Sequence, residues 1–163
     1  MGLIFAAFIT LLLNSAYLSA FSEPSLWYYA NVALHPLLGL ALAVLAAPPV
    51  RRWLTGPVRI SGMCLLAVGL LLGVAILILG ATRPYKSLVN AHVGVSALGA
   101  ALLALDVWRT AAHWNAERLT WVVRVSLAGV LLAAVAATVA RTGRETERRR
   151  VYRIENPTVP PIS

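Results

Sequence analysis

The residues of this chain best suited to chemistry are its three histidines, His35, His92 and His113. The chain has only six acidic residues and one cysteine, Cys64. Six carboxylates leave little material for metal–carboxylate chemistry or for hydrolysis by paired carboxylates. A single cysteine excludes an internal disulfide, a thiolate zinc site, an iron–sulfur cluster and CxxCH attachment of c-type haem. The histidines are therefore the candidate functional residues.

The composition indicates that these histidines lie in a membrane protein. Of the 163 residues, 60% are hydrophobic and 12% are charged, and the mean hydropathy is +0.78. A soluble domain is usually about half apolar and about a quarter charged, so an ordinary cytoplasmic enzyme is excluded. The net charge of +8 would suggest nucleic acid in a soluble protein. Here the basic residues fall between apolar runs, and we expect no nucleic-acid partner.

Five apolar runs are each long enough to cross about 30 Å of hydrocarbon as a helix. They cover residues 2–21, 27–47, 60–81, 87–108 and 121–140. The runs lack the alternating pattern of barrel strands, and tryptophan and tyrosine collect at their ends as in aromatic belts. The sequence thus predicts an all-α integral membrane bundle of five transmembrane helices. This bundle spans residues 1–141, and a basic, then proline-containing extramembrane tail spans residues 142–163.

The expected topology places two of the histidines at similar depth. Short loops make neighbouring helices antiparallel, so the second and fourth helices start on the same side of the bilayer. Side A denotes the side that holds the N-terminus, and side B the opposite side. His35 and His92 lie about eight and about five residues into their helices, which corresponds to about 12 and 8 Å from side B.

Two imidazoles at matched depth on different helices can fill both axial positions of a b-type haem between those helices. Two other interpretations stay open: separate polar residues bonded to neighbouring carbonyls, or a metal ion without porphyrin, for which no third ligand is in view. His113 has no histidine partner near side A, so the sequence predicts one haem rather than two.

Small and polar residues around the pair are the predicted cofactor contacts. Gly39, Ser96 and Gly99 would leave clearance for a porphyrin, whereas Gly69 and Gly73 belong to a glycine line that serves either the cofactor or close helix packing. Arg83 and Lys86 on side B are candidates to pair with haem propionates or to anchor the interface. Asn31 could orient an imidazole N–H or meet a quinone oxygen.

The segments YANVALHPLLG (29–39) and NAHVG (90–94) resemble the membrane b-type cytochromes of bacterial respiratory chains. The segment YRIENPTVPP (152–161) resembles the joining segment before periplasmic multihaem c-type cytochromes. This resemblance implies that His35 and His92 are the axial ligands of one haem b. It also implies electron transfer between a membrane quinone and a c-type partner, as a component of a quinol oxidoreductase. Many such cytochromes carry four ligating histidines, whereas this chain has one clear pair.

The resemblance further implies a bacterial inner membrane location, with the N-terminus cytoplasmic and the C-terminus periplasmic. The loop charges agree, because basic residues are concentrated in the side-A loops. They are Arg51, Arg52, Arg59, Arg109 and Arg118, against Arg83 and Lys86 on side B. The six arginines of residues 141–153 fall on side B and would reverse the count.

The alternative function is a cofactor-free membrane anchor within a larger complex. In that case the arginine-rich tail docks an acidic partner or anionic lipid headgroups, and the glycine line packs against another subunit. A transporter fits less well, because the sequence has no inverted repeat, no broken helix pair and no midplane charge of the expected kind.

Overall fold

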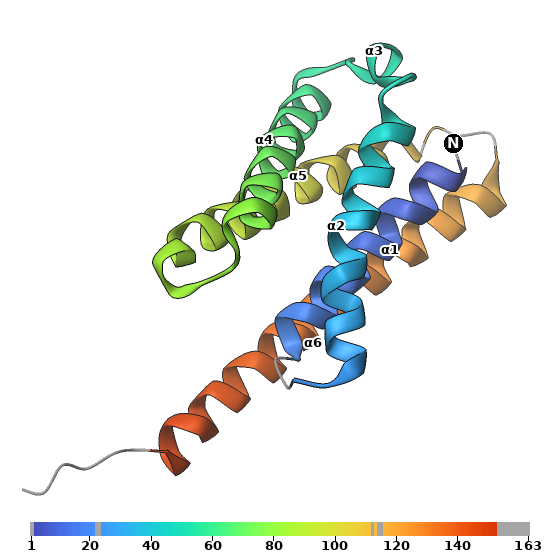
Figure 1. Cartoon of the computed structure of the whole chain (residues 1–163). Coiled ribbons are helices and arrows are strands. Elements are labelled where there is room, and N and C mark those ends of the chain that lie inside the picture. The colour runs from blue at the N-terminus through green and yellow to red at the C-terminus, as the bar shows by residue number, and fades with distance from the viewer. Residues whose placement is uncertain (1, 22–23, 112, 114–115, 153–163) are drawn as a thin grey trace, which may run out of the picture.

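The computed structural model describes residues 2–21, 24–111, 113 and 116–152, which form helices joined by short turns and contain no strand. Five helices are long and apolar enough to span a membrane (Figure 1). They are α1 (Gly2–Ala20), α2 (Leu26–Ala46), α4 (Pro57–Leu79), α5 (Lys86–Ala111) and α6 (Glu117–Val151). A short helix, α3 (Val50–Trp53), and the 3-10 turn η1 (Arg83–Tyr85) lie in two of the connections. The predicted all-α bundle of five membrane-spanning helices is confirmed.

Local sequence signals set several helix ends. The Ser25 side chain accepts a hydrogen bond of 3.1 Å from the backbone N–H of Tyr28 and so caps the start of α2. Pro57 begins α4. Proline is tolerated there because the first N–H groups of a helix have no hydrogen-bond partner within the helix. Gly80 ends α4 with φ of +83°, a left-handed conformation that a side chain would disfavour.

The last helix is longer than the apolar run that predicts it. Helix α6 has 35 residues, which corresponds to about 52 Å, whereas the hydrocarbon layer is about 30 Å thick. The apolar run ends at Ala140, but the helix continues through the arginine-rich segment to Val151. The predicted boundary between residues 141 and 142 therefore falls inside one continuous helix. The tail segment 153–163 lies outside the described residues.

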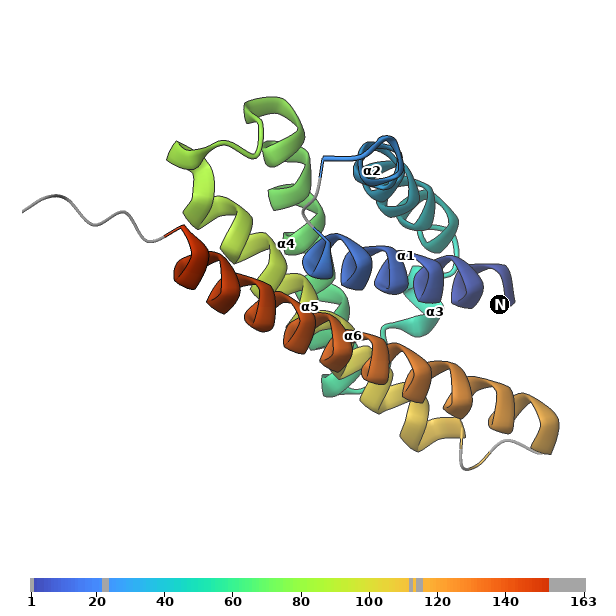
Figure 2. The ribbon, with the colours of Figure 1, turned by 90° about the horizontal axis from the view of Figure 1, so that it is seen from below.

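The helices pack as a hairpin beside a layer of three. Helix α4 packs most extensively against α5, and α1 packs against both α2 and α6 (Figures 1 and 2). Fewer contacts join the two groups, through α5 with α6 and α2 with α4. Helices α2 and α5 run in the same general direction along the bundle (Figure 1).

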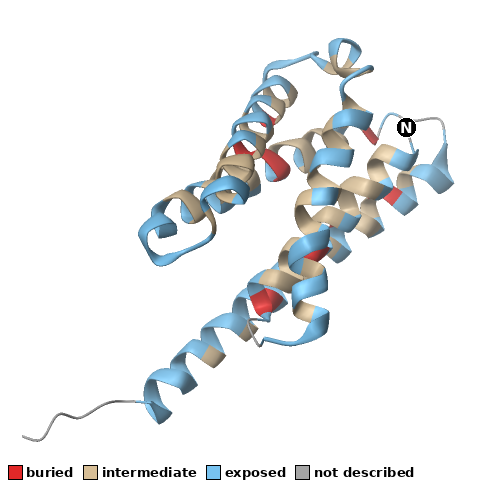
Figure 3. Ribbon diagram, in the orientation of Figure 1, coloured by how far each residue is buried: buried red, intermediate tan, exposed pale blue. Residues whose placement is uncertain are grey.

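Few of the described residues are buried (Figure 3), most of them are small, and many large apolar residues are exposed. The buried apolar residues are Ala20, Ala100, Ala111, Val123, Leu127 and Ala137. Lipid tails are as apolar as leucine, so a membrane protein gains from close backbone approach at helix contacts rather than from burying large side chains.

Glycines form the seam between α4 and α5. A methyl group added to Gly99 would lie 3.0 Å from the carbonyl oxygen of Gly62, and one added to Gly69 would collide with the Ser96 hydroxyl. These residues therefore let the two backbones approach closely. Gly69, Ser96 and Gly99, predicted as cofactor contacts, lie in this seam, which favours the packing interpretation for them.

An ion pair closes the side-A end of the same seam. Arg59 of α4 donates from Nε to Asp106 Oδ2 of α5 at 2.7 Å, and the two side chains are 27% and 17% exposed. A charge-assisted bond in this partly buried position contributes more than an exposed surface pair.

We expect the Asp106→Asn variant to unfold more easily by about 1–3 kcal/mol, because it weakens a bond to a charged group and leaves Arg59 less compensated. The matched control is Arg149→Gln, which breaks an ion pair to Glu145 whose side chains are 80% and 57% exposed. Thermal unfolding in detergent should show a loss for the first variant and almost none for the control. Equal losses would mean that the position of the Arg59 pair in the seam has no energetic consequence.

Candidate functional site

Helices α2 and α5 bring the two predicted histidines into direct contact. The ring centres of His35 and His92 lie 6.2 Å apart, and the ring planes are at 86° to each other. Both side chains are half-buried. The two histidines are 57 positions apart in the chain, so their contact depends on the packing of the whole bundle.

A chain of hydrogen bonds from α1 and α2 orients the His35 ring. Asn31 donates from Nδ2 to the carbonyl oxygen of Trp27 at 2.8 Å, so its Oδ1 is free to accept a bond of 2.9 Å from Asn14 Nδ2. The amide oxygen of Asn14, Oδ1, lies 3.1 Å from His35 Nδ1. Because that oxygen can only accept, His35 carries its proton on Nδ1 in this arrangement.

A backbone carbonyl of α4 orients the His92 ring. Nδ1 of His92 lies 2.8 Å from the carbonyl oxygen of Gly69, which can only accept a hydrogen bond. The next turn of α4 makes room for the ring, since a methyl group on Gly73 would lie 3.0 Å from His92 Cε1. His92 therefore also carries its proton on Nδ1, and its Nε2 keeps a lone pair.

Two features of the pair are compatible with metal ligation: the oxygen acceptors at Nδ1 and the separation of the rings. A metal-binding histidine usually donates its second ring N–H to an oxygen, which fixes the tautomer and raises the basicity of the ligand. Two imidazoles that would hold one metal ion from opposite sides have ring centres about 6 Å apart, because each metal–nitrogen bond is about 2 Å long and each nitrogen lies about 1.1 Å from its ring centre. The observed 6.2 Å agrees with this separation.

The donor set favours a porphyrin over a bare metal ion. In the part of the chain that the structure describes, no group of three or more His, Cys, Asp or Glu side chains could hold a metal ion. Two histidines alone would leave a bare ion with too few protein ligands. A haem supplies four ring nitrogens and needs only the two axial ligands. The two histidines therefore match, in number and residue type, the two protein ligands that a haem needs.

The other predicted contacts fall in three places. Gly39 lies one turn beyond His35 and has no atom within 4 Å of where a Cβ would stand, so it leaves clearance on α2. Arg83 and Lys86 are exposed at the side-B end of α5. Lys86 lies about 9 Å from His92 along the helix axis. Asn31 acts on His35 through Asn14 rather than directly. His113 is exposed in the turn between α5 and α6, away from the pair.

Asn14 and Ser15 complete the site from a helix that the histidine motifs do not include. Asn14 is only 6% exposed and is the one buried polar residue among those described. Ser15 Oγ lies 3.5 Å from His35 Nδ1 and donates to the carbonyl oxygen of Leu11. The available sequence signal was an adjacent pair of polar residues in the middle of an apolar run, but nothing in that run identifies the partner on α2.

We expect the Gly73→Val variant to displace the His92 ring, because the new Cβ and its methyl groups would occupy the space of the imidazole. Overpacking of this kind costs about 1–3 kcal/mol. Nitrogen NMR of ¹⁵N-labelled histidine should show that His92 loses its single Nδ1–H tautomer. Gly94→Val is the control, since a Cβ at Gly94 meets nothing within 4 Å. An unchanged His92 signal in the Gly73 variant would contradict the described contact.

Comparison with known protein families, curated proteins and solved structures gives no match to this chain. Its function is therefore argued from the chemistry of the site rather than from relatives.

Proposed function

We propose that this chain is a membrane b-type cytochrome subunit in which His35 and His92 hold one haem b between α2 and α5. The observation that carries the proposal is the orientation of the pair, in which each Nδ1 faces an oxygen that can only accept a hydrogen bond. Both histidines direct Nδ1–H to an oxygen acceptor, so both keep an Nε2 lone pair, and their rings stand 6.2 Å apart. An unliganded structural pair would need neither a shared tautomer nor this spacing.

A bound haem would supply reversible one-electron chemistry, and the protein would set its potential and orientation. On this proposal, Asn14 and the Gly69 carbonyl hold the ligand rings in place. Arg83 and Lys86, on side B, are near enough in height to pair with carboxylates of the group. The chain would pass electrons between a membrane quinone and a c-type cytochrome, from a bacterial inner membrane with the C-terminus periplasmic.

The first test is the absorption spectrum of the purified full chain, dithionite-reduced minus oxidised, with the haem-to-protein ratio. We expect low-spin b-type bands at one haem per chain. Two haems per chain would contradict the single-site assignment and would require a second ligand set that includes His113. A flat spectrum from correctly assembled protein would overturn the cytochrome proposal and leave the cofactor-free membrane anchor as the better description.

A further inference from the structure

The side-B end of the bundle carries a second group of interacting side chains, separate from the histidines. Arg144 of α6 donates from Nη1 to the carbonyl oxygen of Ala20 at 2.8 Å, and its guanidinium lies 4.5 Å from the centre of the Phe21 ring. Ala20 is the last residue of α1. The guanidinium is therefore held at the height where the first membrane span ends.

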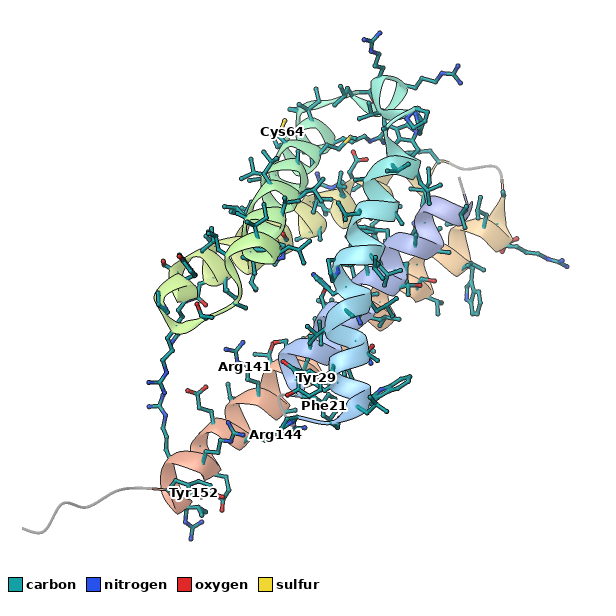
Figure 4. The ribbon with its side chains drawn as sticks, viewed as in Figure 1. Phe21, Tyr29, Cys64, Arg141, Arg144 and Tyr152 are labelled. Carbon is teal, nitrogen blue, oxygen red and sulfur yellow. The ribbon has the colours of Figure 1, made fainter. Side chains whose placement is uncertain are left out.

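Aromatic residues and a second arginine lie at the same end. Figure 4 shows Arg141, Arg144, Phe21 and Tyr29 around the side-B ends of α1, α2 and α6. Arg141 stands three residues before Arg144, so the two project from one face of α6. Phe21 is 41% exposed and Tyr29 is 59% exposed. Arginine beside exposed aromatic rings at the end of an apolar span is typical of the level of lipid headgroups.

The cationic groups here have spare hydrogen-bonding capacity. Among the described residues, the ion pair at this end of α6 joins Glu145 to Arg149, at 3.0 Å, rather than to Arg141 or Arg144. Arg144 uses one of its five N–H groups on the Ala20 carbonyl. A guanidinium fork matches the oxygens of a phosphate, which can accept two parallel bonds.

The position of Arg141 and Arg144 along α6 favours a lipid over a water-soluble protein as their ligand. Arg141 directly follows the apolar run that ends at Ala140. Along the helix axis, Arg148 and Arg150 lie about 10 and 13 Å beyond Arg141, and about 6 and 9 Å beyond Arg144. Headgroup phosphates are next to the hydrocarbon boundary, at the level of Arg141 and Arg144. A protein partner in water would meet the outer arginines first.

We propose that Arg141 and Arg144, with Phe21 and Tyr29 beside them, bind the headgroup phosphate of an anionic phospholipid at the side-B surface. This site does not depend on the haem, so it can be tested on protein with or without the cofactor.

The test is binding of phosphatidylglycerol to the full chain in detergent, followed by native mass spectrometry and by the shift in thermal unfolding, with phosphatidylcholine as the neutral comparison. We expect phosphatidylglycerol to bind preferentially. The Arg141→Gln variant should lose about fivefold in affinity while the Arg144 bond to α1 stays intact, and the double variant with Arg144→Gln should lose more. Arg148→Gln with Arg150→Gln is the charge-matched control and should change binding little.

Three results would overturn the proposal. Equal binding of the two lipids would remove the role of anionic charge. An equal loss of phosphatidylglycerol affinity in the Arg148 and Arg150 control would show that the arginines attract the lipid by their total charge and not through a defined site. Competition by soluble glycerophosphate or by polyglutamate as effective as that of the lipid would assign the arginines to a free anion or to an acidic protein.

Discussion

Replacing either His35 or His92 with alanine should abolish the low-spin haem spectrum and lower the haem affinity by well over tenfold. Loss of a residue that only supports a metal ligand already costs about 10–100-fold in affinity, so loss of the ligand itself should cost at least as much. Both single variants should lose the low-spin spectrum to the same extent, because a low-spin bis-histidine centre needs both histidine ligands. The measurement is the haem-to-protein ratio and the reduced-minus-oxidised spectrum.

His113→Ala is the matched control for these two variants. His113 lies exposed in the turn between α5 and α6, and it should be replaceable without effect on the spectrum. Added imidazole should partly restore the bands of the His92→Gly variant by filling the vacated space next to Gly73. Retention of a full low-spin spectrum in either alanine variant would show that the pair does not hold the cofactor.

The Asn14→Leu variant should have the second largest effect, although Asn14 never touches the proposed iron. Its amide oxygen accepts the His35 Nδ1–H at 3.1 Å, and its Nδ2 holds Asn31 at 2.9 Å. Without this acceptor the tautomer of His35 is no longer fixed, and we expect haem affinity to fall about 10–100-fold. The haem that remains should have a higher reduction potential, because a less basic imidazole stabilises the ferric state less.

A merely structural role for Asn14 would not move the potential, so redox titration distinguishes the two roles. Thr10→Val is the control on the same helix, since Thr10 bonds only to the carbonyl oxygen of Ala6 among the described residues. Circular dichroism should confirm that both variants keep their helices. If Asn14→Leu lowers stability but leaves the potential and affinity at wild-type values, the amide stabilises the bundle without tuning the ligand.

The length and spacing of apolar runs determined most of the fold. A run of about 20 apolar residues must satisfy its backbone within itself in lipid, so each run predicts a helix before any packing is known. The same rule failed at the end of α6, because hydropathy marks where lipid contact stops and not where a helix stops. The arginines after Ala140 are good helix formers, and a helix already nucleated in the membrane extends through them.

The role of the glycines could not be decided from their positions. An absent side chain leaves room equally for a porphyrin or for another helix. Packing in three dimensions separates the two uses: Gly69 and Gly99 lie in the α4–α5 seam, whereas Gly73 makes room for the His92 ring.

Hydropathy alone establishes five helices long and apolar enough to cross a membrane, because each apolar run must satisfy its backbone within itself. The similar depth of His35 and His92 stays a prediction, made from the rise per residue and the short connections. The meeting of the two rings, and the oxygen acceptors that Asn14 of α1 and the Gly69 carbonyl of α4 place at their Nδ1 atoms, depend on the tertiary structure. Those contacts join four helices, and side-chain packing between helices depends on rotation about each helix axis, which hydropathy leaves undetermined.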